Sequence, residues 1–221
     1  MTRSILAVLA AAVSVTVVAG TGCGSSGVGD PCTPEAEYAQ SFLGFNVAEV
    51  NVESKSFQCE TRLCLANHFQ GRVTCPYGQP ANAFAMGAPA NGNPPAGANF
   101  ACFTPIGDPV TGIDPATGMF DDPTTGATVK PQCTDRTTQQ AVYCSCRCAN
   151  VDGQTNDGAN YCTCPKGFSC TQLVSSIGAA DVGLTGAYCI LSGTEYNPNN
   201  SCGATCDPTA QNCGEIQIKT Q

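Results

Sequence analysis

The strongest chemical pattern in the sequence is a group of five cysteines spaced two residues apart within residues 142–170. Side chains at this spacing point to the same face of an extended strand. The polar, glycine-containing residues 149–160 separate two such runs, which predicts a hairpin that gathers the sulfurs. The five residues are Cys144, Cys146, Cys148, Cys162 and Cys164.

Two chemistries fit this sulfur density. Reduced thiolates could bind a soft metal ion, as in metallothionein-like clusters and zinc sites. Oxidised cysteines would instead form disulfides, and neighbours at i and i+2 would then bond to different elements because their geometry disfavours a bond between them. The compartment decides between the two, since disulfides persist in exported proteins.

The N-terminus predicts export. Arg3 precedes an apolar run that Ser14 and Thr16 alone interrupt, and residues 1–22 are typical of a signal peptide. The run is shorter than the roughly 20 residues that span a bilayer, so no permanent transmembrane helix is expected. Cleavage after Ala19 would release a periplasmic or secreted protein.

Cys23 offers a second way to process the signal. Gly20 to Cys23 resembles the lipobox of bacterial lipoproteins, although Gly20 stands where an aliphatic residue is usual. Lipidation would also explain the odd count of 17 cysteines, because it leaves an even 16 to pair. We therefore expect a lipid anchor at Cys23, with residues 23–34 as a tether to the membrane.

The remaining cysteines predict a small disulfide-rich fold, mainly β and loop with little helix, in two disulfide-stapled lobes. The chain has no Trp, 12% charged residues, 24 Gly and 15 Pro, so covalent bonds must replace much of the hydrophobic core. The expected disulfide cysteines are Cys32, Cys59, Cys64, Cys75, Cys102, Cys133, Cys144, Cys146, Cys148, Cys162, Cys164, Cys170, Cys189, Cys202, Cys206 and Cys213.

Residues 35–80 form the expected N-terminal, β-rich lobe. A brief helix over residues 35–43 and strands at 45–47, 50–52, 63–65 and 72–75 are predicted from the side-chain spacing. The four cysteines of this part, counted from Cys32, are enough for two internal bridges. His68, the one histidine of the chain, falls in a turn between two of these strands.

Residues 81–132 have the composition of a loop or linker, rich in Pro, Gly and Asp. Three turn-forming DPxTG pentapeptides occur here, and Cys102 and Cys133 bracket them, so one large closed loop is possible. Aspartates in the turns could bind Ca²⁺, although solvated turns are the simpler interpretation. These aspartates are Asp108, Asp114, Asp121 and Asp122.

Residues 133–221 form the expected C-terminal disulfide-rich lobe. A helical turn is predicted before Gln140, the hairpin follows, a helix is predicted over residues 170–178, and a strand over 187–191 ends at Gly193. The polar loop 149–160 is the best candidate for a contact surface.

Several function classes find no support in the sequence. With Arg3 removed the formal charge is −9 in place of −8, and no Lys/Arg run exists, so no nucleic-acid partner is expected. No nucleophile motif accompanies His68, no C-x-x-C redox motif occurs, and no phosphate-binding Gly loop is present. We expect no enzyme and no cofactor, with metal binding as the alternative function.

Two resemblances accompany these patterns. The run of Cys162, Cys164, Pro165, Gly167 and Phe168 resembles the end of an EGF-like module. Cys23, the CETRLCLANHFQGRVTCPYG segment and the CSCRCANVDGQTNDGANYCTCPKGFSCTQLVSS segment together resemble cysteine-rich lipoproteins of myxobacterium-like Gram-negative bacteria. That resemblance implies location at the outer membrane or cell surface. The expected function is therefore a structural, adhesive or binding module.

Overall fold

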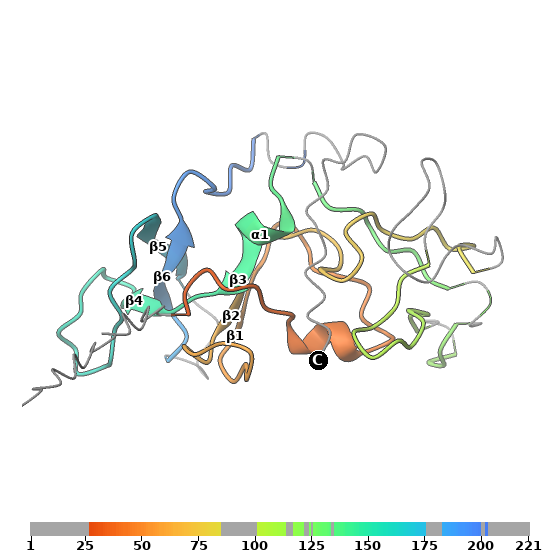
Figure 1. Cartoon of the computed structure of the whole chain (residues 1–221), viewed down its shortest axis with the longest axis horizontal. Helices are drawn as coiled ribbons and strands as arrows, with labels where there is room; N and C mark the ends of the chain where they lie inside the picture. The colour runs from red at the N-terminus through yellow and green to blue at the C-terminus, as the bar shows by residue number, and fades with distance from the viewer. Residues whose placement is uncertain are drawn as a thin grey trace, which may run out of the picture.

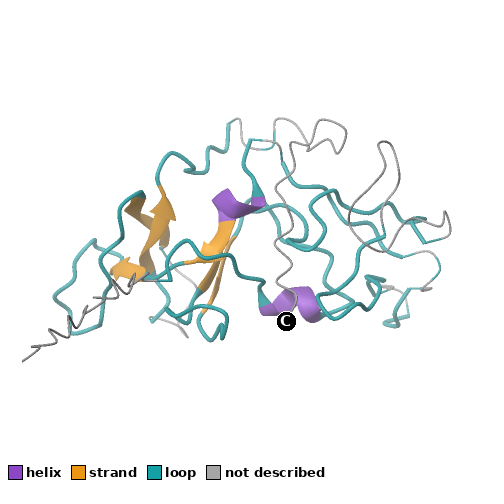
Figure 2. Cartoon of the chain, viewed as in Figure 1, coloured by secondary structure: helices purple, strands orange, loops and turns teal. Residues whose placement is uncertain are grey.

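The computed structural model describes residues 27–84, 101–113, 117–121, 124, 126–133, 135–175, 183–199 and 202. Strands gather in one half of the molecule, and loops build most of the other half (Figure 2). The elements are the 3-10 helix η1 (Glu35–Tyr38), the helix α1 (Thr138–Ala141) and the strands β1 (Val50–Glu53), β2 (Cys64–Asn67), β3 (Val142–Cys144), β4 (Arg147–Ala149), β5 (Phe168–Val174) and β6 (Gly186–Leu191).

The first sheet has the order β1-β2-β3 and is antiparallel. The apolar alternation of β1 places Val52 opposite Leu65 of the central strand, whose four residues are all buried. On its other side β2 pairs with β3, so Leu65 faces Tyr143 and Cys64 faces Cys144. A strand from late in the sequence therefore closes a sheet begun by the N-terminal segment.

The second sheet has the order β4-β6-β5 and is also antiparallel. The chain enters it directly from the first sheet through Ser145, which is fully buried. The Ser145 amide donates to the Leu63 carbonyl at 3.0 Å, and its hydroxyl donates to the Cys189 carbonyl at 2.7 Å. Ser145 thus joins the two sheets by hydrogen bonds to both.

The apolar core lies where the two sheets meet. Tyr143 of β3 packs its ring edge to face against Phe168 of β5, with centroids 5.8 Å apart. Its hydroxyl accepts a hydrogen bond from the Leu191 amide at 3.0 Å, so the polar end of this buried side chain is satisfied. The buried members of the cluster are Leu63, Leu65, Tyr143, Val174, Tyr188 and Ile190.

Buried polar side chains organise the loop-rich half. The Gln79 side chain is buried and donates to the carbonyls of Val110 at 2.9 Å and Ala127 at 2.7 Å, and it accepts from the Cys102 amide. Backbone bonds between Gln79 and Val129 run alongside. Gly78 permits this approach: its φ is +72°, and a Cβ there would lie 2.5 Å from the Val129 carbonyl oxygen.

A buried ion pair links η1 to the segment after β2. Arg72 Nε lies 3.2 Å from a carboxylate oxygen of Glu37, and both side chains are fully buried. The carboxylate also accepts from the Val73 amide at 2.8 Å and the Thr74 hydroxyl at 2.7 Å. Burial raises the pKa of Glu37, against the lowering influence of Arg72 and of these hydrogen bonds. A full set of donors thus surrounds the buried carboxylate.

The expected fold class is confirmed: the protein is disulfide-rich, mainly β and loop, with two helices of four residues each among the described residues. The strand at 50–52 and the strand ending before Gly193 are present as β1 and β6. Helical residues precede the β3 strand as expected, because Thr137 and Gln140 form a capping box at α1.

Four expected elements are wrong or shorter than predicted. The strand predicted at 45–47 is limited to an isolated bridge between Phe45 and Gly71. Residues 72–75 form only an isolated bridge, because β2 pairs with β1 and β3 instead. The predicted helix over 170–178 is strand β5 as far as Val174, since pairing with β6 outweighs the helical spacing of its apolar residues. The brief helix at 35–43 is limited to η1. Ile177, the last apolar residue of the predicted helix, lies outside the described residues.

Candidate functional site

Three disulfides form a sulfur cluster on the second sheet, named here the hub: Cys146–Cys162, Cys148–Cys170 and Cys164–Cys189. Cys189, fully buried on the central strand β6, lies at its centre. Its sulfur is 3.7 Å from that of Cys146 and 3.6 Å from that of Cys162, neither of which is its bonded partner. The hub therefore packs disulfide against disulfide.

The predicted hairpin is wrong, although most of its sulfurs do converge. Cys144 ends β3 in the first sheet, whereas Cys148 lies on β4 in the second, so the C-x-C-x-C run crosses between sheets instead of lying on one strand face. Cys162 and Cys164 lie in irregular backbone. As expected, Cys144, Cys146 and Cys148 each bond to a different segment.

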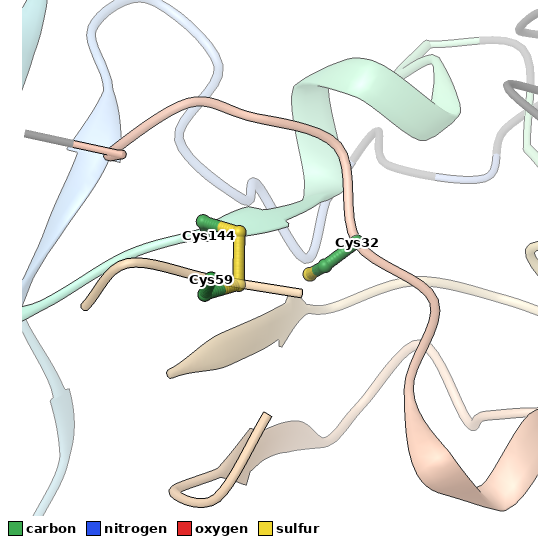
Figure 3. A group of neighbouring side chains, drawn as sticks. All are labelled: Cys32, Cys59 and Cys144. Atoms are coloured by element: carbon green, nitrogen blue, oxygen red, sulfur yellow. A yellow bond between two sulfur atoms is a disulfide. The ribbon is translucent and has the colours of Figure 1, made fainter. Parts of the chain in front are cut away.

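A second sulfur cluster lies on the first sheet. Cys59, in the loop between β1 and β2, bonds to Cys144 of β3, and Cys32 approaches the same place from the N-terminal segment (Figure 3). Cys32 itself bonds to Cys64 of β2. All four sulfurs are buried, and they fix the N-terminal segment and the 54–62 loop onto the sheet.

The remaining described disulfides are Cys75–Cys102 and Cys133–Cys202. The expectation of two bridges internal to the N-terminal lobe is wrong, because only Cys32–Cys64 is internal to it. Nor do Cys102 and Cys133 close one loop together. Cys206 and Cys213, expected to pair, lie outside the described residues, so fourteen of the expected sixteen cysteines form the seven disulfides.

The disulfides restrict which sulfurs could bind a metal ion. Three-sulfur groups within 4.8 Å occur in both clusters, such as Cys146 with Cys162 and Cys189. Every sulfur of these groups is bonded in a disulfide, and metal binding needs free thiolates. Of the four aspartates considered for Ca²⁺, Asp108 and Asp121 are described and join no such group, and Asp114 and Asp122 lie outside the described residues.

The exposed loop 149–160 is built around Asp157. This carboxylate accepts from the Tyr161 hydroxyl at 2.6 Å, the Asn150 amide group at 3.1 Å and the Ala159 backbone at 3.1 Å. These bonds, the Tyr161 hydroxyl first, lower the pKa of Asp157. Arg147 stacks on the Tyr161 ring with its guanidinium 5.0 Å from the centroid.

The same loop is closed at its base by Cys146–Cys162 and by the backbone bond from the Cys162 amide to the Arg147 carbonyl. Asn150 further folds it, since its side-chain oxygen accepts from the amides of Asp152 at 3.0 Å and Gln154 at 2.8 Å. The loop projects from the end of the molecule that carries β4 (Figure 1). It is thus an exposed surface in a defined conformation.

A small polar cavity of about 160 Å³ lies beside α1. Arg136 forms part of its wall, and its guanidinium donates to the carbonyls of His68 at 3.0 Å and Gln140 at 3.4 Å. The Thr194 hydroxyl donates to the backbone as well, so the cavity presents no activated nucleophile. Its lining residues are Asp135, Arg136, Gln140, Gly193, Thr194, Glu195 and Asn197.

His68, expected in a turn, has a left-handed backbone with φ of 51° and lies directly after β2. Its ring stacks on Tyr196, and its Nδ1 lies 2.8 Å from the Val47 carbonyl. Burial lowers the pKa of His68, partly offset by the bond to Val47. These contacts make the side chain part of the packing between β2 and the C-terminal segment.

The expected tether is shorter than residues 23–34. The Gly29 amide donates to the Cys144 carbonyl at 2.8 Å, and the Cys144 amide donates to the Asp30 carbonyl at 2.7 Å. Cys32 is disulfide-bonded two residues later. The chain is therefore part of the fold from Gly27 onward. Cys23 and the expected signal peptide lie outside the described residues.

Sequence reasoning missed two of these features. Nothing in the spacing of Cys189 predicts its place at the centre of the hub, because strand order alone puts it there. The bond between Asp157 and Tyr161 has a weak local signal, since the two residues are four apart at the end of a polar loop.

Within the described part of the chain, no helix is both long and apolar enough to span a bilayer. No protein-family model matches the chain, and neither does any curated protein or any solved structure. What can be inferred about its function therefore rests on its own residues and their geometry.

Proposed function

We propose that the protein is a non-enzymatic envelope lipoprotein, anchored through Cys23, that presents a disulfide-stabilised binding module at the cell surface. The carrying observation is that the described chain is cross-linked by seven disulfides and belongs to the fold from Gly27, its first described residue. Disulfides at this density support an oxidising, extracytoplasmic environment.

The surface proposed for binding is the loop 149–160. Its exposed polar groups are held by Asp157, and Cys146–Cys162 closes its base. A loop that is already ordered loses little conformational entropy on binding, which favours its use as a binding surface. In the polar cavity beside Arg136, the Thr194 hydroxyl and the two terminal guanidinium nitrogens donate to backbone carbonyls.

The intact mass of the native, membrane-extracted protein tests the anchoring. We expect acyl chains on a chain that starts at Cys23, and two hydrogens fewer for each disulfide. A Cys23→Ala variant should lose the acyl mass and leave the membrane fraction. A chain that starts at Gly20 without acyl chains would refute the anchor, and sixteen thiols that alkylate without reductant would refute the cross-linked core.

Cross-linking on intact cells tests the binding role. A photoreactive residue at Val151, exposed in the loop, should capture a neighbour, and the same residue at exposed Met119 in the other half serves as the matched control. Equal products from the two positions would contradict the assignment of the loop as the binding surface.

A further inference from the structure

The loop between β1 and β2, residues 54–62, combines features found at membrane interfaces. Phe57 is 85% exposed, the highest value among the large apolar side chains of the described residues. The Arg62 guanidinium stacks on the Phe57 ring, 4.4 Å from its centroid. Lys55, two residues before Phe57, is also exposed. Aromatic and basic side chains together favour the headgroup layer of a bilayer.

The loop holds this aromatic side chain in a fixed place. Cys59 bonds to Cys144 of β3, and the Ser56 amide donates to the Arg62 carbonyl at 3.1 Å. Arg62 adopts a left-handed backbone with φ of 62°, which gives the loop its sharp turn back into β2. Burying Phe57 against a partner would therefore cost little loop ordering.

The same loop lies beside Gly27, the described residue nearest to Cys23 in the sequence. A Cβ on Gly27 would lie 2.9 Å from Glu60 Cβ. The Thr33 amide donates to the side-chain oxygen of Gln58 at 3.0 Å, and the side-chain nitrogen of Gln58 donates to the Thr33 carbonyl at 2.7 Å. The N-terminal segment and the loop thus form one surface.

The length of chain outside the described residues limits how far this surface lies from an anchor. Only four residue steps separate Cys23 from Gly27, which reach about 14 Å when fully extended. Acyl chains on Cys23 must lie in the hydrocarbon core, and the headgroup layer outside it is roughly 5–8 Å thick on each side. Gly27 therefore lies within about 14 Å of Cys23, in the headgroup layer or a few ångströms outside it, and the 54–62 loop adjoins Gly27.

We propose that the 54–62 loop is a membrane-contact surface, in which Phe57 enters the headgroup layer of the bilayer that carries the anchor and Lys55 and Arg62 face its phosphates. The inference rests on the proposed lipidation of Cys23. Glu60 is the one acidic residue of this loop, and it lies on the Gly27 side.

Fluorescence can test the contact because the chain contains no Trp. F57W introduces a single reporter at an exposed site. F120W is the matched control: Phe120 is 58% exposed and bridges to Ile113 of segment 101–113, which lies in the loop-rich half of the molecule, away from β4, β5 and β6 (Figure 1). Near-UV circular dichroism and disulfide mapping check that both variants fold as the parent does.

The anchor is imposed chemically so that the test does not depend on natural lipidation. The mature chain from Cys23 is coupled through that thiol to a maleimide lipid in phosphatidylcholine vesicles with a quarter phosphatidylglycerol, with and without brominated acyl chains. Emission of F57W should shift to the blue and fall at least about twofold with brominated lipid, as expected for a side chain in the interface, whereas F120W should not change.

Equal quenching of F57W and F120W, or no quenching of F57W on coupled protein, would overturn the membrane contact. Failure of the proposed function would be visible separately, since the intact mass of the native protein would then lack acyl chains at Cys23 whatever the vesicles show.

Discussion

Removing the Cys59–Cys144 disulfide should destabilise the protein more than removing Cys146–Cys162. The two bonds close loops of very different length, with sequence separations of 85 and 16. A disulfide stabilises mainly by restricting the unfolded chain, and the effect grows with the logarithm of loop length. The double variants C59A/C144A and C146A/C162A therefore form a matched pair, each losing one bond and two sulfurs.

The magnitudes follow from loop-closure entropy. A loop of 85 residues corresponds to about 4.6 kcal/mol and one of 16 to about 3 kcal/mol. Other disulfides provide shorter paths in both cases: Cys75–Cys102 lies inside the long loop, and Cys148–Cys170 bypasses part of the short one. With these paths counted, the values fall to about 4 and somewhat below 3 kcal/mol. A difference of more than about 1 kcal/mol remains.

Burial acts in the same direction. Cys59 and Cys144 are at most 3% exposed, so their truncation also leaves a cavity, whereas Cys162 is half-buried. Guanidinium chloride unfolding without reductant measures the free energies, followed by tyrosine fluorescence and near-UV circular dichroism because Trp is absent. If C146A/C162A lost as much free energy of unfolding as C59A/C144A, the loop-closure reasoning would be refuted.

Three further predictions concern buried polar groups. E37Q leaves the Arg72 charge buried without its partner and should lower the free energy of unfolding by about 3–5 kcal/mol. The apolar double variant E37L/R72M should lose less free energy of unfolding, and denaturant titration measures both. Q79A leaves three buried backbone groups without hydrogen-bond partners, and it should lower the free energy of unfolding by several times the roughly 1 kcal/mol of an ordinary hydrogen bond. Hydrogen exchange at the Cys102 amide should become faster, and unchanged exchange there would contradict the prediction. His68 has a lowered pKa in the folded state, so the unfolded chain takes up the proton first as the pH falls below the ordinary value of 6.5. The free energy of unfolding should therefore drop as the pH falls through that range, and H68Q should lack the drop.

The composition was enough to predict the fold class, because a chain this poor in charged and aromatic residues needs covalent cross-links. Local patterns also located β1 and β6, whose apolar alternation and glycine boundaries are short-range signals. These features depend on residues that are neighbours in sequence, and no knowledge of the tertiary arrangement is needed to read them.

Strand order could not be predicted from such patterns. The sheet β1-β2-β3 joins Leu65 to Tyr143, which are far apart in the chain, and nothing in the sequence around Leu65 specifies that partner over the nearer segment 72–75. The helical spacing of Leu173, Val174 and Ile177 was likewise a true local signal that was outweighed, because β5 pairs along its length with β6.

The cysteines show most clearly why spacing alone does not determine connectivity. In each sheet two cysteines stand directly opposite each other on adjacent strands, Cys64 with Cys144 and Cys170 with Cys189. Neither pair is bonded: each of the four sulfurs bonds to a cysteine elsewhere. Three of these bonds tie a further segment to a sheet, and Cys148–Cys170 joins the two outer strands of the second sheet.

A bond between opposite strands would only reinforce contacts that backbone hydrogen bonds already make. Most of the observed bonds instead attach irregular segments, such as those of Cys32 and Cys164, to a strand. In a chain with little apolar surface to bury, a disulfide contributes most where no sheet pairing exists. The same reasoning explains how the exposed loops 54–62 and 149–160 remain ordered. In the first loop, Cys59 bonds to Cys144 of β3. Beside the second, Cys162 bonds to Cys146, which lies between β3 and β4.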